Sequence, residues 1–551
     1  MSLMGSLYIG ASGLQTSQNA LNTTAHNMSN IDTAGFVRQQ VQQGTRIYKT
    51  ISTSGAAIAY TQTGLGVNYT NVKQIRDYFL DRTYRRESGR SAFYDTWTST
   101  VEEVEDLFQE LEGEAFGESI ENLWKSVQEL SKSPENSVNQ GAFVQRCSEF
   151  ISRAKSVYTG LCEYQDNLNY KIAKEVETMN AYAQRISELN KEILKIESGK
   201  IEHANDLKDE RNQLIDELSA MANIDCKEDA LGNAIIKLEG KEFVKDDSFN
   251  KIELYADPET GFYTPYWSHL VEKDASGNVP PDKDADGNVI ALQGGTLFRM
   301  DQEISTAANT DIGALKAMLF ARGDHRATYE DLDPAIYDSK TSSSILMNVQ
   351  AEFDQLINKV AEGINKIFAD AADRATAEQG AGSTYMRDTN ITNPDGTHPA
   401  YKIFDTVTGS TKFTIDNLTI NSVIKQAPSL LGMVKEDGKV DQETADALKE
   451  LFSKNDQLTL NPNVKTTTNF INYYNNLIIQ VGNTGDVLRG ISENQQMTVD
   501  NTYAAREQVL GVSSDEELSN MVMFQNAYNA SSRYINVISE LLEHIINSLG
   551  R

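Results

Sequence analysis

The sequence predicts a mainly α-helical protein that carries β-rich inserted domains. Heptad patterns, in which apolar residues recur at alternating spacings of three and four, occupy both ends of the chain. A longer pattern of this kind covers residues 144–196, and β-branched, turn-rich sequence is confined to the middle. We therefore expect a coiled coil of the two terminal helices, a long helical bundle or coiled-coil domain, and two β-rich or α+β inserts.

Length and composition limit the class of protein. At 551 residues the chain is too long for one core of the usual size, so several domains are expected. A formal charge of −29, from 79 acidic and 50 basic residues, disfavours nucleic acid and anionic membranes as partners. The three cysteines lie far apart without a CxxC pair, which gives no sign of a disulfide framework or zinc ribbon.

The N-terminus lacks the basic start and continuous apolar core of a secretory signal, and no apolar run approaches the roughly 20 residues of a membrane helix. Any export would therefore use another route. The first helical pattern instead alternates spacings of three and four through Met4, Leu7, Ala11, Leu14, Gln18, Leu21, Ala25 and Met28. It stops at Asn30, and the polar residues 30–35 end in a glycine, which predicts a turn. Residues 37–70 favour an extended, partly β segment.

The strongest helical signal covers residues 144–196. Within its seam of apolar positions only Gln165 and Glu175 are polar, and one continuous helix of this length would measure about 80 Å at 1.5 Å per residue. Only a partner helix can cover such a seam, so we expect it to pack on the helix that begins near Thr466.

Two stretches favour β structure. Residues 224–305 contain short runs such as 234–238 between Asp, Gly and Pro, with two similar turn signatures at 273–279 and 283–289 that predict adjacent hairpin tips. Residues 381–460 form the second stretch, with their best strand at 411–415.

The last helix is expected to start at Ser514, which forms a capping-box pattern with Glu517. The predicted domain division pairs residues 1–38 with 512–551 as a terminal coiled coil. It places residues 39–223, 306–380 and 461–511 in a long helical domain, with 224–305 and 381–460 as the inserted domains.

Neither terminal helix can bury its own stripe, and each large apolar side chain gains roughly 1.5–3 kcal/mol when covered. The cover comes from the other terminus, from neighbouring subunits, or from both. Gln18 and Gln525 either fix the register of the seam or lie at its solvated edge. The predicted assembly interface contains Leu7, Leu14, Gln18, Leu21, Met28, Asn30, Gly35, Phe36, Leu518, Met521, Gln525, Tyr528, Ile535, Leu542 and Ile545.

Two terminal motifs resemble a known family. Residues 13–21 (GLQTSQNAL) and 27–38 (NMSNIDTAGFVR) resemble the N-terminal signature of flagellar rod, hook and hook-associated proteins, with Ser29 where Ala is usual and Phe36 where Tyr is frequent. Residues 511–528 resemble the C-terminal signature of the hook-associated protein 1 family, and residues 206–214 resemble its mid-chain helix.

The resemblance implies an extracellular structural subunit of the bacterial flagellum that joins the hook to the filament. It implies export without a cleaved signal peptide, through the flagellar type III apparatus. The implied partners are further copies in a ring, the hook protein, the next hook-associated protein on the filament side, and a cytoplasmic export chaperone on the C-terminal helix. A hook-type or rod-type axial protein and a coiled-coil scaffold are the alternatives.

Catalytic and metal-binding patterns are absent from the sequence. The six histidines never stand at ligand spacing, and no HExxH, GxSxG or phosphate-loop motif occurs. The Asp-rich residues 282–293 imitate the first half of a calcium loop, but position twelve is Gln293 rather than Glu. We expect no enzyme activity, no cofactor and no metal.

Overall fold

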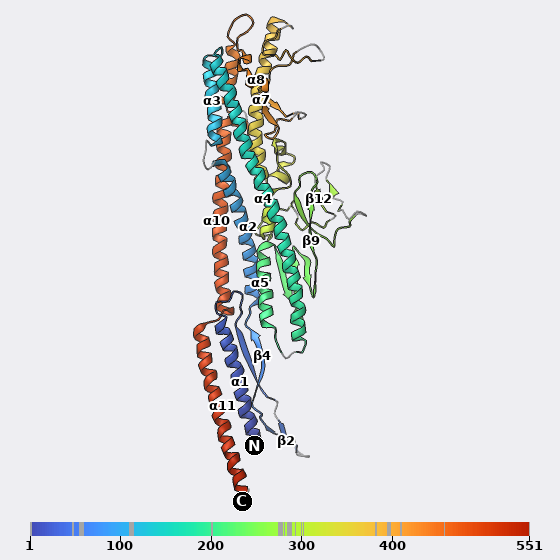
Figure 1. The fold of residues 1–551 in the computed structure, drawn as a ribbon, viewed down its shortest axis with the longest axis vertical. Helices are drawn as coiled ribbons and strands as arrows, with labels where there is room; N and C mark the ends of the chain where they lie inside the picture. Colours follow the sequence, from blue (N-terminus) through green and yellow to red (C-terminus); the bar gives the residue numbers. More distant parts are fainter. Residues whose placement is uncertain are drawn as a thin grey trace. The chain divides into compact units, whose positions relative to one another are not determined.

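The computed structural model describes residues 3–46, 49–53, 60–109, 115–199, 202–273, 279, 282–283, 289–292, 294–298, 300, 302–380, 383–393, 398–407, 410, 412–456 and 458–549. The chain divides into two compact units, which we describe one at a time. The first comprises Met1–Ser91, Glu177–Ile252 and Gln495–Arg551, and the second comprises Ala92–Val176 and Glu253–Asn494. Long helices with small sheets make up both units (Figure 1), so the predicted fold class is confirmed.

The first unit contains both chain termini. Helix α1 (Leu3–Ser29) lies beside helix α11 (Ser514–Leu549), as Figure 1 shows. An antiparallel ladder of β1 (Gln39–Thr45) and β4 (Val67–Gln74) also contacts α1, and β2 (Lys49–Thr53) pairs with β3 (Tyr60–Thr63). Helix α5 (Asn205–Met221) is followed by an antiparallel sheet in the order β5-β6-β7-β8. Its strands are Ile224–Glu228, Ala234–Leu238, Lys241–Lys245 and Ser248–Phe249.

The second unit is built on helices. Its complete helices are α3 (Phe116–Lys132), α6 (Ala314–Arg322), α7 (Ile345–Gln379), α8 (Ser422–Gln426) and α9 (Gln442–Ser453). Helices α2 (Tyr78–Gln109) and α10 (Phe470–Leu510) contribute residues to both units. The small ladders pair β9 (Ile252–Ala256) with β10 (Tyr263–Trp267), β11 (Asp282–Lys283) with β12 (Val289–Ala291), and β13 (Phe404–Thr406) with β14 (Leu418–Ile420).

Helix α4 runs without interruption from Ser137 to Glu197, so the predicted continuity is confirmed. Its apolar seam is buried, since Ile172 and Leu189 have no exposed surface. Gln165, a polar seam residue, is also fully buried, and its side chain donates to the Arg322 carbonyl and accepts from Gln350 of α7. The contacts described for α4 run to α2, α3, α5 and α7. Packing of α4 on α10 stays a prediction.

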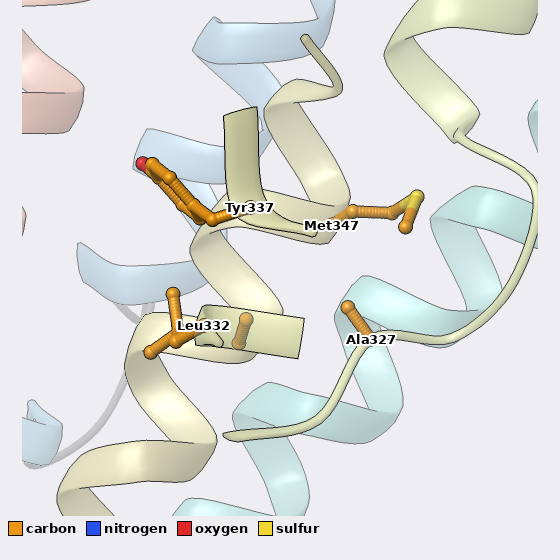
Figure 2. Close-up of a cluster of buried hydrophobic side chains, with 5 residues drawn as sticks. Ala327, Leu332, Tyr337 and Met347 are labelled. Carbon is orange, nitrogen blue, oxygen red and sulfur yellow. The ribbon is translucent and has the colours of Figure 1, made fainter. Parts of the chain in front are cut away.

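A small cluster of buried apolar side chains packs around the start of α7. The chain between α6 and α7 folds back through a 3-10 turn (Tyr329–Leu332) and a π turn (Tyr337–Thr341). Figure 2 shows Ala327, Leu332 and Tyr337 of this connection beside Met347 of α7, and Ala351 completes the cluster. The Tyr337 hydroxyl donates to Asn348 Oδ1 at 2.9 Å, so its polar end is satisfied.

Asparagine side chains on the helices form hydrogen bonds with the backbone of neighbouring β segments. Asn190 of α4 pairs with both backbone groups of Ala234, and Asn180 does the same with Ile252. Asn169 binds the Tyr263 amide and the Gly261 carbonyl, and Asn365 of α7 binds Phe404 in both directions. A side-chain amide can donate from its nitrogen and accept at its oxygen, so each asparagine pairs with a peptide backbone much as a neighbouring strand would.

The prediction of a strand at residues 411–415 is wrong for the described residues 412–415. Their backbone groups are satisfied by α7 instead: Ile415 donates to Asp354 Oδ1 at 2.7 Å, and Asn358 donates to the Phe413 carbonyl. The alternating pattern therefore marks a segment laid on a helix. The Asp-rich residues 284–288, Gln293 and the turn at 274–278 lie outside the described residues.

Replacing Ile172 with Asp should place an unpaired charge in the dry seam and lower the stability of the second unit by several kcal/mol. Tyr170→Asp is the matched control, since Tyr170 lies on the same helix and is 62% exposed. Thermal melting followed by circular dichroism measures both. Equal melting temperatures for the two variants would contradict the seam assignment.

The second unit should lose stability as the pH rises through neutrality. Burial raises the pKa of Glu352 to about 7, although Asn461 and Gln480 donate hydrogen bonds to it. The protonated form is favoured on folding, so this stabilisation is complete below pH 4.5 and is lost as the pH rises through 7. It amounts to roughly 3 kcal/mol. Urea denaturation between pH 5 and 8 should show the decline, and Glu352→Gln should flatten it. An unchanged slope in the variant would refute the assignment.

Candidate assembly interface

Small residues form the face of α1 that meets α11. A Cβ atom on Gly10 would lie 2.7 Å from Ile535 Cγ1, and a Cβ atom on Gly13 would lie 2.8 Å from Ser531 Oγ. Ser17 and Ala20 continue the same helical face and are 7% and 0% exposed. The two helix backbones therefore approach closely, which side chains larger than these would prevent.

The predicted α1 seam flanks this contact face. Leu7, Leu14, Leu21 and Met28 are only half-buried, and Gln18 is exposed. The seam that was predicted from hydrophobicity is shifted by one residue along the sequence from the face that meets α11. In the single chain, the predicted leucines therefore keep surface that a further partner can cover.

Most of the less exposed positions of α11 form a regular stripe. They recur at spacings of three and four and comprise Glu517, Met521, Phe524, Tyr528, Ser531, Ile535, Ile538 and Leu542. Four of the predicted interface residues, Met521, Tyr528, Ile535 and Leu542, belong to this α1-facing stripe. Leu518, Gln525 and Ile545 lie outside it and are exposed.

A second apolar stripe on α11 was missed by the sequence reasoning. It comprises Met523, Ala527, Ala530, Tyr534, Val537, Leu541 and Ile545, again at spacings of three and four. Of these, only Ile545 was predicted, and Tyr534 borders α1, since a Cβ atom on Gly10 would lie 3.1 Å from its ring. Met523, Val537 and Leu541 are 53%, 52% and 48% exposed. We call this set the open stripe. Of the two stripes on this helix, α1 covers the first, and the second has room for a further helix.

A short segment after α1 ties three helices together. Asn27 of α1 accepts from the Gln39 amide at 3.0 Å and donates to the Gln39 carbonyl at 2.8 Å. The Val37 amide donates to Asp209 of α5, and the Arg38 amide donates to the carbonyl of Leu510, the last residue of α10. We call residues 35–39 the corner segment. Asn27 stands inside the N-terminal motif, yet no heptad rule points to it.

Arg38 fixes the start of α11. Its guanidinium lies 2.7 Å from Glu516 and 2.9 Å from Glu517, and Glu517 is only 2% exposed. The predicted capping box is therefore wrong in its partners. Ser513 provides the cap, because its hydroxyl and carbonyl accept from the Glu516 and Glu517 amides, and the Glu517 side chain binds Arg38 instead.

The predicted turn residues support the corner segment. Asn30 donates to the His26 carbonyl and closes the end of α1. Gly35 has a φ of +78° and its missing Cβ would lie 3.2 Å from Gln213 of α5, so a side chain there meets both strain and contact. Phe36 packs edge-on against His26 at 5.4 Å. Burial raises the pKa of Asp209 to about 7 although the Val37 amide donates to it.

A buried ionic network holds α2, α5 and α10 next to this segment. Arg506 of α10 lies 2.9 Å from Asp81 and 2.6 Å from Asp216, and Arg85 shares Asp216 at 2.6 Å. Arg76 completes it at 2.9 Å from Asp81. Removing one partner of such a network costs about 3–5 kcal/mol because a charge stays buried without compensation.

Within the described ranges, no group of three or more His, Cys, Asp or Glu residues is placed to hold a metal ion. Over the same residues, no helix is both long and apolar enough to cross a membrane. The distinctive features are the helix pair, the open stripe and the corner segment.

Three family models match the middle and both ends of the chain. Residues 101–382, just over half of the chain, match the model of the flagellar hook-associated protein FlgK helical domain. Residues 7–36 match the flagella basal body rod protein family, and residues 509–549 match the C-terminal family of basal body rod FlgEFG proteins. Both terminal matches fall on the paired helices.

Full-length relatives carry the name flagellar hook-associated protein 1. The protein from Bacillus subtilis strain 168 is 25% identical over 541 residues, covering 98% of this chain and 96% of the relative. The Salmonella typhimurium protein is 24% identical, covering 97% and 98% respectively. The flagellar hook junction protein FlgK from Burkholderia pseudomallei shares the fold, with a TM-score of 0.52 at 13% identity over 78% of this chain and all of that one.

Fold and terminal helices thus define an axial protein of the bacterial flagellum, which is a structural class and not an enzyme class. Within that class the chain belongs to the flagellar hook-associated protein FlgK family.

Gly10→Leu should separate the terminal helices, because the new side chain would occupy the position of Ile535. Overpacking of this kind costs about 1–3 kcal/mol. Ala11→Leu is the control, since Ala11 is the next residue of α1 and is exposed. Limited proteolysis of the C-terminal helix reports the effect. Equal cleavage rates for both variants would argue against the small-residue contact.

Proposed function

We propose that the chain forms the junction between hook and filament by assembling through its terminal helices, with the open stripe of α11 as the contact to a neighbouring copy. The observation that carries this is the exposure of Met523, Val537 and Leu541 on a heptad pattern that α1 leaves largely uncovered. An exposed apolar stripe of this length promotes aggregation of a free protein, but it allows helix pairing between subunits.

Assembly would also complete the folding of the terminal helices. Helices of about four heptads are marginal in water unless tertiary contacts cover their apolar faces, and α11 is covered on one side only. A neighbouring copy would cover the open stripe together with the half-buried Leu7, Leu14 and Leu21. Ordering and assembly then become one event.

The same stripe supports a role for a cytoplasmic chaperone. Before assembly, a partner that lays the C-terminal helix into an apolar groove would hide Val537 and Leu541 from aggregation. Export through the flagellar type III apparatus, without a cleaved signal, would deliver the chain to the extracellular flagellum. Its neighbours there would be other copies in a ring, the hook protein, and the next hook-associated protein on the filament side.

The domain division proposed from the sequence fits this role. Residues 1–38 and 512–551 would form the assembling coiled coil. The helical domain of residues 39–223, 306–380 and 461–511 would carry the inserts 224–305 and 381–460 outside the terminal contacts.

Val537→Asp and Ile538→Asp separate the two stripes. Val537 is 52% exposed on the open stripe, whereas Ile538 is 7% exposed on the α1-facing stripe. Val537→Asp should leave the melting of the free chain unchanged and abolish filament attachment, because a charge in an assembled apolar seam costs several kcal/mol. Ile538→Asp should loosen the helix pair already in the free chain.

Electron microscopy of flagella from complemented deletion strains measures the outcome. Hooks without filaments in the Val537→Asp strain support the proposal. Normal filaments in that strain, with the variant present in the flagellum, would overturn it.

A further inference from the structure

The start of α2 concentrates positive charge in an acidic chain. Residues 76–90 contain five arginines and three acidic residues, whereas the whole chain has a formal charge of −29. Three of these side chains, Arg76, Arg85 and Arg90, are about nine-tenths buried and lie within 3.0 Å of a carboxylate. Their charge is used inside the first unit, so the other two arginines, Arg82 and Arg86, provide the positive charge of the surface.

Arg82 and Arg86 lie on one face of α2 together with Phe79. The three residues stand three and four positions apart, and Phe79 is 74% exposed. Arg82 is exposed, and within the described residues it pairs with no carboxylate. Arg86 lies 2.7 Å from Glu87, but that carboxylate also binds Arg90 at 3.0 Å. One carboxylate thus serves two arginines, and the surface stays positive. We call Phe79, Arg82 and Arg86 the basic face.

A hollow of about 710 Å³ opens elsewhere on the first unit, where the end of α1, the β1–β4 ladder and the start of α5 meet. Val72, Ile196 and Leu207 give it an apolar lining, and Ile196 is 42% exposed. Glu202 and Asp206 add two carboxylates, both exposed. No residue of the basic face lines this hollow. We call it the acidic hollow, and it has room for an aromatic side chain.

The carboxylates of the acidic hollow keep capacity for an incoming cation. Glu202 has no ionic partner among the described residues. Asp206 accepts a hydrogen bond from the neutral amide of Gln39 at 3.2 Å and lies 3.5 Å from His26, and its side chain is 74% exposed. The nearby Lys208 is already engaged, at 2.8 Å from Glu197. A guanidinium is the cation that binds carboxylates most directionally.

We propose that the basic face of one copy docks into the acidic hollow of the next copy. Phe79 would cover the apolar lining, and Arg82 and Arg86 would bind Glu202 and Asp206. The two surfaces are complementary in kind, because an aromatic side chain flanked by two guanidinium groups meets an apolar floor flanked by two carboxylates. Aromatic and arginine side chains are also the residues that most often dominate the binding energy of an interface.

Two observations select a second copy as the occupant. Both surfaces belong to the same unit but share no residue, and a contact between two different surfaces of one chain is the kind that repeats around a ring. The hollow is lined by His26 of α1 and Gln39 of the corner segment, so it continues the candidate assembly interface. The inference rests on the proposed function, since it takes for granted that copies assemble, and it names the residues on each side of a second contact.

A charge swap within one chain tests the pairing. Arg82→Glu and Glu202→Arg should each lower the number of filament-bearing hooks about tenfold, because like charges would then face each other. The chain with both substitutions should restore wild-type numbers, because every copy then presents a reversed but complementary pair. Contact with a different protein predicts no such rescue.

Asp247→Arg is the matched control, since Asp247 is exposed in the same unit and does not line the hollow. Alone it should match the wild type, and combined with Arg82→Glu it should restore nothing. All these variants should melt as the wild type does, because the altered side chains are exposed. Normal filament numbers for Arg82→Glu, or a swap that fails to restore them, would overturn the proposal.

Photochemical cross-linking locates the contact without changing a charge. A benzophenone amino acid at position 79 should, in isolated flagella, form a covalent dimer of the chain whose cross-link maps to residues 202–207. An adduct with another flagellar protein, or no adduct in flagella that contain the chain, would refute the docking. Val537→Asp tests the terminal helices separately. Filament loss in that strain beside normal filaments in the Arg82→Glu strain would reject this contact and leave the proposed function standing.

Discussion

The C-terminal helix has more apolar surface than the described residues of its own chain cover. Two heptads interleave on α11, and close packing against Gly10 and Gly13 of α1 covers one of them. The second, through Val537 and Leu541, remains open. Each large side chain on it would gain roughly 1.5–3 kcal/mol from burial, so covering this stripe would favour assembly. The contacts of Arg38 hold the first turn of this helix in place.

Polar contacts around the corner segment set the direction of α11. Arg38 binds the first turn of α11 through Glu516 and Glu517, and its amide binds the end of α10. Asn27 and Asp209 hold the same segment from α1 and α5. Charge-assisted and buried hydrogen bonds are strongly directional, so they fix an angle where apolar packing alone would allow several. The motif at residues 27–38 is therefore explained by geometry as well as by family membership.

The sequence predicted correctly the helices that follow from a single heptad pattern. The continuous α4 follows from its seam, and the start of α11 was placed correctly although Ser513, not Ser514, caps it. It did not predict the phase of the α1–α11 contact, because glycines that permit close approach carry no hydrophobic signal. It misassigned residues 412–415 because α7 satisfies the backbone groups of Phe413 and Ile415. The paired roles of Asn27 and Asn365 depend on residues that meet only after folding. The open stripe on α11 did have a signal, a second heptad offset from the first.

Hydrogen exchange before and after assembly tests the central claim most directly. We predict that amides of residues 523–545 exchange rapidly in the free chain and become strongly protected in isolated flagella, while α4 is protected in both. Strong protection of residues 523–545 in the free chain, or no gain of protection on assembly, would contradict the account.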